Sequence, residues 1–187
     1  MKKYLPDYLF LFSIAIPIIL LDQFTKLIVR SNLAFGEIWP QGHWISQYAR
    51  IIHISNTGAA FGILQNFGLV FTILPFIVAG VILYYFPKIP RDDWALRIAL
   101  SLQFGGALGN LIDRLTIGEV TDFISVGGFA VFNIADASIS IGVAILAITM
   151  FSRERKQSQI DEQDTSGEGQ ASKDEMSSSV SKELESE

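Results

Sequence analysis

The sequence contains no cysteine among its 187 residues. This absence excludes disulfide bonds, thiolate metal sites and a cysteine nucleophile. Histidine is scarce too: His43 and His53 lie ten residues apart without an HExxH pattern, which favours packing or surface roles over zinc ligation. The chain also has no glycine-rich phosphate loop. We therefore expect neither a metal nor another cofactor.

Charge is distributed unevenly along the chain. Lysine and arginine form no patch outside the short flanks of the apolar segments, so we expect no nucleic-acid partner. Residues 153–187 contain no aromatic residue and hold five Lys/Arg against ten Asp/Glu, whereas residues 1–152 hold nine of each. Such a segment cannot bury enough apolar surface to offset the entropy of ordering it. The composition predicts a disordered acidic cytoplasmic tail at 153–187 after a folded domain at 1–152.

The apolar residues, half of the chain, gather in four segments at roughly 8–28, 67–86, 94–112 and 132–151. A helix that spans a membrane needs about 20 predominantly apolar residues. The third segment contains Arg97 and is assigned because an odd number of spans would contradict the flanking charges. The pattern predicts an all-α membrane protein, a bundle of four transmembrane helices.

Basic residues flank the four segments asymmetrically. The two longer loops, residues 30–66 and 113–131, carry only three of them. Because positive charge is retained in the cytoplasm, we expect both termini inside and both longer loops outside. The residues assigned to the cytoplasmic side are Lys2, Lys3, Lys88, Arg91, Arg153, Arg155 and Lys156.

The outer loop at about 31–66 differs in composition from the spans. Its stretch "WISQYARIIHISN" is rich in β-branched and aromatic residues and is bounded by Gly42 and Gly58. These features favour strands. We expect a small extracytoplasmic β-rich domain at the membrane surface.

Acidic residues converge at one level near the outer ends of the spans. Asp22 lies about 21 Å from the cytoplasmic end of the first span at 1.5 Å per residue. Asp113 ends the third span, Asp122 follows in the outer loop, and Asp136 begins the fourth span. Charged groups in spans cost roughly 2.5–3.5 kcal/mol and usually face a bundle interior or a cavity. We expect these groups to share one site.

Asp122 and Asp136 form the chemically informative pair. They are joined by a segment whose Gly127-Gly128 can turn the chain back on itself. Two carboxylates in a partly dry site cannot both ionise easily, so one holds a proton as an acid while the other stays a base. This is the equipment of an aspartic hydrolase, which activates water. By itself, however, Asp136 is equally typical of a helix N-terminal cap.

Other polar residues have structural alternatives. Asp22 can pair with Lys26 one turn on, Arg114 can pair with Asp113, and Asn56 can serve a turn. Two rival functions also stay open at this point. A four-span transporter would use a buried carboxylate to bind protons or cations, and an assembly subunit would use its polar faces to bind other helices.

Five motifs together resemble the lipoprotein signal peptidase (signal peptidase II) family. They are "DQFTK" at 22–26, "NTGAAFG" at 56–62, "GNLIDR" at 109–114, "VTDFI" at 120–124 and "FNIADASI" at 132–139. The resemblance implies a multi-pass aspartyl peptidase of the bacterial cytoplasmic membrane, acting near the outer leaflet. It also implies that the enzyme removes the signal peptide of a prolipoprotein just before its diacylglyceryl-cysteine.

The resemblance also implies roles for individual residues. The catalytic pair falls on Asp122 and Asp136. Other matching positions support the site or contact substrate and globomycin-type peptide inhibitors; they are Asp22, Asn56, Gly58, Gly106, Asn110, Arg114, Asn133 and Ala135. Besides prolipoproteins and these inhibitors, we expect membrane lipid as a partner, and we expect the protein to be a monomer.

The tail composition yields a first testable prediction. Deletion of the chain after Arg155 should leave peptidase turnover intact, because the removed segment has no aromatic and few apolar residues to contribute to a folded core. Cleavage of a lipidated precursor by the truncated and full-length proteins measures this directly. A large loss of turnover on truncation would contradict it.

Overall fold

A computed structural model describes residues 2–56, 68–156 and 158 of the chain. The chain divides into two compact units, Met1–Leu146 and Ala147–Glu187, and every contact discussed below lies within the first. The helices are α1 (Leu5–Asn32), α2 (Gly68–Tyr85), α3 (Trp94–Thr116) and a fourth long helix at Ile134–Lys156; short 3₁₀ turns occupy Lys2–Tyr4, Trp44–Gln47 and Phe86–Lys88. The strands are β1 (Ile38–Trp39), β2 (Ala49–Asn56) and β3 (Val120–Val126).

Four helices are long and apolar enough to cross a membrane, as the sequence predicted. The first is longer than expected: α1 begins with a proline in its first turn, where a missing N–H costs nothing, and ends where Leu33 becomes extended. Large apolar side chains such as Leu9, Leu20 and Phe24 are exposed along α1. In a bilayer these side chains would face lipid.

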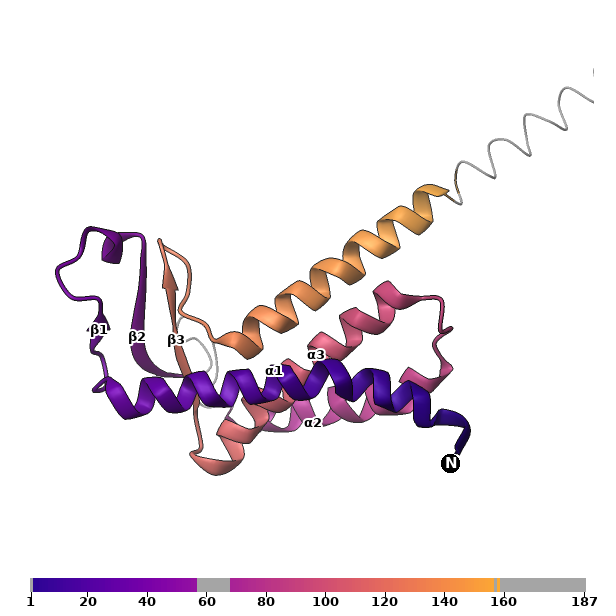
Figure 1. The fold of residues 1–187 in the computed structure, drawn as a ribbon, viewed down its shortest axis with the longest axis horizontal. Coiled ribbons are helices and arrows are strands. Elements are labelled where there is room, and N and C mark those ends of the chain that lie inside the picture. Colours follow the sequence, from indigo (N-terminus) through magenta and orange to yellow (C-terminus); the bar gives the residue numbers. More distant parts are fainter. Residues whose placement is uncertain (1, 57–67, 157, 159–187) are drawn as a thin grey trace, which may run out of the picture. The chain divides into compact units, whose positions relative to one another are not determined.

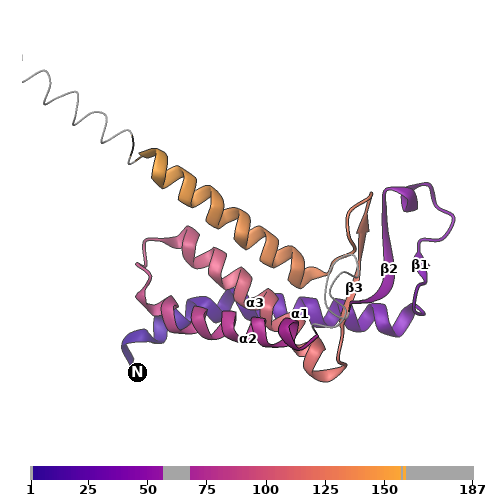
Figure 2. The ribbon, with the colours of Figure 1, turned by 180° about the vertical axis from the view of Figure 1, so that it is seen from behind.

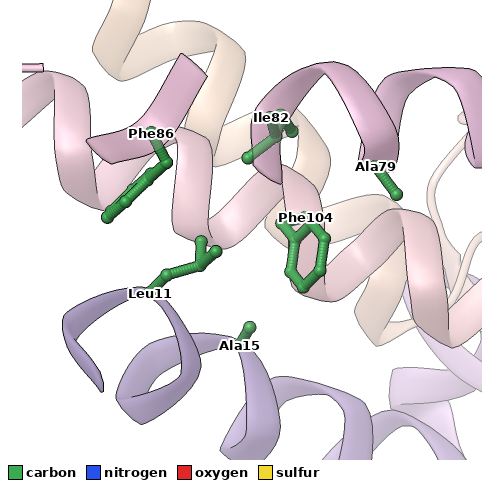
Figure 3. Packing of buried hydrophobic residues seen from close by; sticks show 6 residues of the cluster. All are labelled: Leu11, Ala15, Ala79, Ile82, Phe86 and Phe104. Atoms are coloured by element: carbon green, nitrogen blue, oxygen red, sulfur yellow. The ribbon is translucent and has the colours of Figure 1, made fainter. Parts of the chain in front are cut away.

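The helix α3 lies inside the bundle, since it is the most buried of the four. Figures 1 and 2 show it running beside α1. Its Phe104 packs into a cluster with side chains from α1, α2 and the following turn, drawn in Figure 3. The other members are Leu11, Ala15, Ala79, Ile82 and Phe86. This interior position explains why the third span is the most polar.

A buried ion pair explains the arginine that makes this span atypical. Arg97 is 3% exposed, and its Nη1 lies 3.0 Å from Oδ1 of Asp7 on α1. Its guanidinium also lies 4.9 Å from the ring centroid of Phe10 and 4.8 Å from that of Phe86. A buried charge is tolerated when it is paired and hydrogen-bonded. The sequence analysis did not anticipate this pair.

Three glycines of α3 allow other elements to approach its backbone. A Cβ on Gly105 would lie 3.1 Å from backbone atoms of Ala15 in α1. A Cβ on Gly106 would collide with the carbonyl oxygen of Ala135 and lie 2.7 Å from Oγ of Ser138, both in the fourth helix. Small residues at such contacts are typical of membrane helices.

The strands form one antiparallel sheet in the order β1-β2-β3. Figures 1 and 2 show it at the C-terminal end of α1. The prediction of strands in the loop at 31–66 is confirmed for β1 and β2. The sequence analysis assigned no strand to 113–131, although β3 lies there and pairs with β2, with Ile54 opposite Asp122. This pairing joins the two longer loops, which are separated in sequence by the whole of α2 and α3, so no local pattern could predict it.

The glycine contacts generate a second prediction. Gly106→Ala should destabilise the protein by about 1–3 kcal/mol, because the added methyl group overpacks the contact with the fourth helix. Gly80→Ala in α2 is the matched control, since a Cβ there meets nothing within 4 Å. Thermal unfolding in detergent measures both. Equal melting temperatures for the two variants would contradict the close approach.

Candidate active site

The chain turns back on itself directly after β3. Gly127 adopts a φ of +54°, a left-handed conformation that suits glycine. Phe132 then pairs with Ile124: the N–H of Ile124 donates to the carbonyl of Phe132 at 2.8 Å, and the reciprocal bond is 3.0 Å. This confirms the predicted turn at Gly127-Gly128, and it brings Asn133 back beside Asp122.

Asn133 and Asp136 start the fourth helix by capping each other. The backbone N–H of Asp136 donates to Oδ1 of Asn133 at 2.9 Å, and the backbone N–H of Asn133 donates to Oδ2 of Asp136 at 3.3 Å. These reciprocal bonds form a capping box, which satisfies two backbone donors at a helix start. The capping role considered for Asp136 is therefore real, and it also fixes the direction of the carboxylate.

The two aspartates receive hydrogen bonds from asparagine side chains. Nδ2 of Asn133 donates to Oδ1 of Asp122 at 2.7 Å, and Nδ2 of Asn56 donates to Oδ2 at 2.9 Å. Nδ2 of Asn110 donates to Oδ1 of Asp136 at 2.7 Å. The asparagines come from three elements: Asn56 ends β2, Asn110 lies on α3, and Asn133 caps the fourth helix. Thus Asn133 contacts both acids.

Both carboxylates line one cavity of about 720 Å³. Its other polar lining residues are Asn56, Arg114 and Ser140. Its apolar lining consists of Phe71, Gly128, Phe129, Ala130, Val131, Phe132, Ala137 and Ile141. A few convergent polar groups in an apolar pocket of this size are typical of a ligand site.

Burial raises the pKa of Asp122 to about 6. The side chain is 3% exposed, and removing a carboxylate from water disfavours its charged form. Hydrogen bonds from Asn56 and Asn133 oppose this rise, whereas the nearby charge of Asp136 adds to it. Asp122 therefore keeps a proton more readily than an ordinary aspartate does.

Asp22 holds the start of the fourth helix from the opposite side. Its Oδ1 accepts the backbone N–H of Ala135 at 3.0 Å, and its Oδ2 lies 2.8 Å from Nζ of Lys26. The Asp22–Lys26 ion pair considered as an alternative is therefore confirmed. It uses only Oδ2 of Asp22, and Oδ1 holds the segment that carries Asp136. Gly109 permits this contact, since a Cβ there would lie 2.8 Å from Oδ2 of Asp22.

Arg114 does not take the structural role considered for it. Its predicted partner Asp113 is instead bonded to Lys26 at 3.2 Å and to Arg30 at 3.4 Å, and it accepts the backbone N–H of Thr121 at 3.0 Å. Asp113 and Arg114 are adjacent in the sequence, but their side chains lie on different sides of α3. Arg114 lines the cavity beside both aspartates.

The remaining predicted positions fall into two groups. Gly106 and Ala135 shape the contact between α3 and the fourth helix rather than line the cavity. Gly58 lies outside the described residues.

Sequence reasoning missed Lys26 as a member of the site, although its spacing of four residues from Asp22 was the available signal. Within the described parts of the chain, no group of three or more acidic or histidine side chains is arranged to hold a metal ion.

A sequence model of the family described as Signal peptidase (SPase) II matches residues 14–152. The chain belongs to the signal peptidase II family. A lipoprotein signal peptidase of Syntrophus aciditrophicus is 42% identical over 84% of this chain and 100% of its own length. Another, from Shouchella clausii, is 41% identical over 78% of this chain and 95% of its own length.

Solved structures agree with this assignment. A bacterial membrane enzyme determined at 2.3 Å resolution is 36% identical, with a TM-score of 0.70 over 76% of this chain and 87% of that chain. A second, at 1.9 Å resolution, has a TM-score of 0.67. The family identified from the five motifs is confirmed, and the transporter and assembly-subunit alternatives lose their support.

The raised pKa of Asp122 generates a third prediction, for stability against pH. Between its ordinary pKa of 3.8 and its folded pKa of about 6, the folded protein keeps a proton that the unfolded chain releases. The contribution of Asp122 to the free energy of unfolding should therefore fall by roughly 3 kcal/mol as the pH rises from about 4 to above 6. Thermal unfolding should show a smaller decline in Asp122→Asn. Parallel pH curves for the two proteins would contradict the assignment.

Proposed function

We propose that this member of the signal peptidase II family cleaves prolipoproteins with a water molecule activated between Asp122 and Asp136. The observation that carries the proposal is that two carboxylates from separate elements line one cavity and are both bonded to Asn133. A pair of acids in one site can supply both proton transfers of hydrolysis without a metal.

The environments of the two acids suggest their roles. Asp122 is the more buried, and burial raises its pKa, so we assign to it the proton that the pair holds at the start of the reaction. Asp136 then acts as the base: it takes a proton from water while the water oxygen attacks the scissile carbonyl carbon. Asp122 donates its proton to the carbonyl oxygen. When the C–N bond breaks, Asp136 returns its proton to the leaving amine, and Asp122 takes back a hydroxyl proton from the tetrahedral intermediate, which becomes the new carboxyl group.

The cavity fits a lipid-linked peptide. Phe71, Phe129, Phe132 and Ile141 give it apolar walls, suited to acyl chains and to an apolar signal peptide. Arg114 supplies a cationic donor for a backbone carbonyl of the substrate. We propose that the diacylglyceryl-cysteine occupies this cavity and that cleavage occurs just before it. Peptide inhibitors of the globomycin type would compete for the same place.

The proposed orientation follows from the basic flanks. The loop between α2 and α3 carries Lys88 and Arg91, and the same sign of charge occurs before α1 and after the fourth helix. We propose that these ends lie in the cytoplasm. The sheet and the cavity would then lie toward the outer leaflet, where a lipid-linked precursor presents its cleavage bond. We further propose that the protein acts as a monomer, because one chain supplies both acids.

Substitution of either acid gives a fourth prediction. Asp122→Asn and Asp136→Asn should each lower cleavage of a diacylated precursor by at least about 10²-fold, the range typical of losing an acid–base group. Each variant should still insert in the membrane, because asparagine preserves the shape of the side chain. The matched control is Asp92→Asn, the same change at an exposed residue between α2 and α3. Normal cleavage by either catalytic variant would refute the site.

A further inference from the structure

The proposed reaction does not use Lys26, although this residue is fully buried beside the site. Its side chain is 0% exposed. Its Nζ lies 2.8 Å from Oδ2 of Asp22, 2.9 Å from Oδ1 of Asn110 and 3.2 Å from Oδ2 of Asp113. An ammonium group has three N–H donors and no acceptor. All three donors therefore have acceptors on two different helices.

The contact with Asn110 determines which way its amide group faces. Because Lys26 can only donate, the end of the amide that faces it must be the oxygen. The NH₂ end then faces the fourth helix, where it donates to Oδ1 of Asp136 at 2.7 Å. With the amide reversed, two donors would face each other at Lys26, and two acceptors would face each other at Asp136.

The same constraint passes on to Asn133. Oδ1 of Asn110 also accepts a hydrogen bond from Nδ2 of Asn133 at 3.0 Å. The same Nδ2 donates to Oδ1 of Asp122 at 2.7 Å, while Oδ1 of Asn133 accepts the backbone N–H of Asp136 at 2.9 Å. The backbone N–H of Asp136 can also only donate, so it and the ammonium group of Lys26 favour the same direction for the side-chain bonds in this series.

We propose that Lys26 is a positioning residue that orients Asn110 and Asn133, so that both aspartates receive N–H donors and the pair keeps a single proton. This inference rests on the proposed function of the two acids. A carboxylate that accepts N–H donors is favoured in its ionised form. Without Lys26, the oxygen of Asn110 loses its charged donor and keeps only Nδ2 of Asn133. Asn110 then turns its oxygen toward Asp136 more readily, which favours a second proton on the pair and an inactive enzyme.

The charge of Lys26 is balanced where it lies. Asp22 and Asp113 contact it directly, and Arg30 on α1 contacts Asp113 from the other side. Arg114 is the cation that lines the cavity itself, and the β2 residue that contacts the pair, Asn56, is uncharged. Two acids offset two bases in the cluster around Lys26. The charge of Lys26 still lowers the pKa of Asp122, so the test must separate this effect from that of hydrogen-bond direction.

The test compares Asp22→Asn with the double variant Asp22→Asn/Lys26→Met. In both, asparagine can still accept the N–H of Ala135, and the double variant removes the ion pair without leaving its carboxylate unpaired. The acid limb of the pH–rate profile is the range in which activity rises with pH. We expect this limb to move to higher pH by about one unit in the double variant. This is the shift expected from losing one hydrogen bond to a charged group. Turnover below that limb should fall about tenfold. An unchanged limb would overturn the inference.

A matched control separates positioning from loss of stability. Asp7→Asn/Arg97→Met removes an equally buried ion pair, 3.0 Å long, from the other end of the same bundle. It should lower the melting temperature but leave the acid limb in place. If this control moves the limb as far as the Lys26 variant does, general loosening explains the effect and the inference fails.

A double-mutant comparison separates orientation from charge. In an Asn110→Ala background, adding Lys26→Met should cause no further movement of the limb, because the group that transmits the effect is gone. Residual turnover and carbon-13 NMR of labelled aspartate carboxyls both measure it. An equal movement with and without Asn110 would mean that Lys26 acts by its charge alone, which overturns the inference.

A second pair of variants tests the same inference if the double variant folds poorly. Lys26→Arg keeps a group that only donates and should retain the wild-type limb, whereas Lys26→Gln can accept a hydrogen bond and should displace it. Identical profiles for the two would overturn the inference. Normal cleavage by Asp122→Asn would instead refute the proposed function itself, so the two failures are distinguishable.

Discussion

The structure depends on one set of hydrogen bonds, those between Asn133 and the two aspartates. Asn133 caps the fourth helix through Asp136, and its amide nitrogen reaches Asp122 on the neighbouring strand at 2.7 Å. The first turn of the fourth helix is therefore also part of the candidate active site. A helix start must satisfy its free N–H groups, and here the groups that satisfy them include one of the two acids proposed to activate water.

This arrangement requires a rigid support, which α3 provides. Its glycines admit the fourth helix on one side and α1 on the other, while its Arg97 and Asp113 form ion pairs at opposite ends of the helix. Breaking a buried ion pair by removing one partner is costly, since it leaves a charge without compensation. The polar residues that make α3 an unusual membrane span are thus the ones that hold α1 and the fourth helix in register. The apolar residues of the bundle contribute packing (Figure 3).

The sheet contributes differently, by bringing two distant loops together. β2 carries Asn56 and β3 carries Asp122, and pairing of these strands sets Asn56 within 2.9 Å of the carboxylate. Diagonal neighbours on one face of a sheet lie within reach of each other's side chains. The prediction of strands at 31–66 was correct, yet it did not include β3, because that strand has no local partner. The turn at Gly127 was visible in the sequence, and its consequence, the return of Asn133 to Asp122, was not.

The sequence by itself determined the four spans, the family and the identity of the two candidate acids, because hydrophobic length and short motifs are local properties that need no folded neighbour. It also offered each structural alternative for Asp22, Asp136 and Arg114 but could not choose between them. Only the tertiary structure decided that Asp113 faces Lys26 while Arg114 faces the cavity, and that Asp136 both caps a helix and meets the site. The physical reason is that hydrogen-bond partners and burial arise between segments far apart in the chain, where spacing along the sequence carries no information about distance.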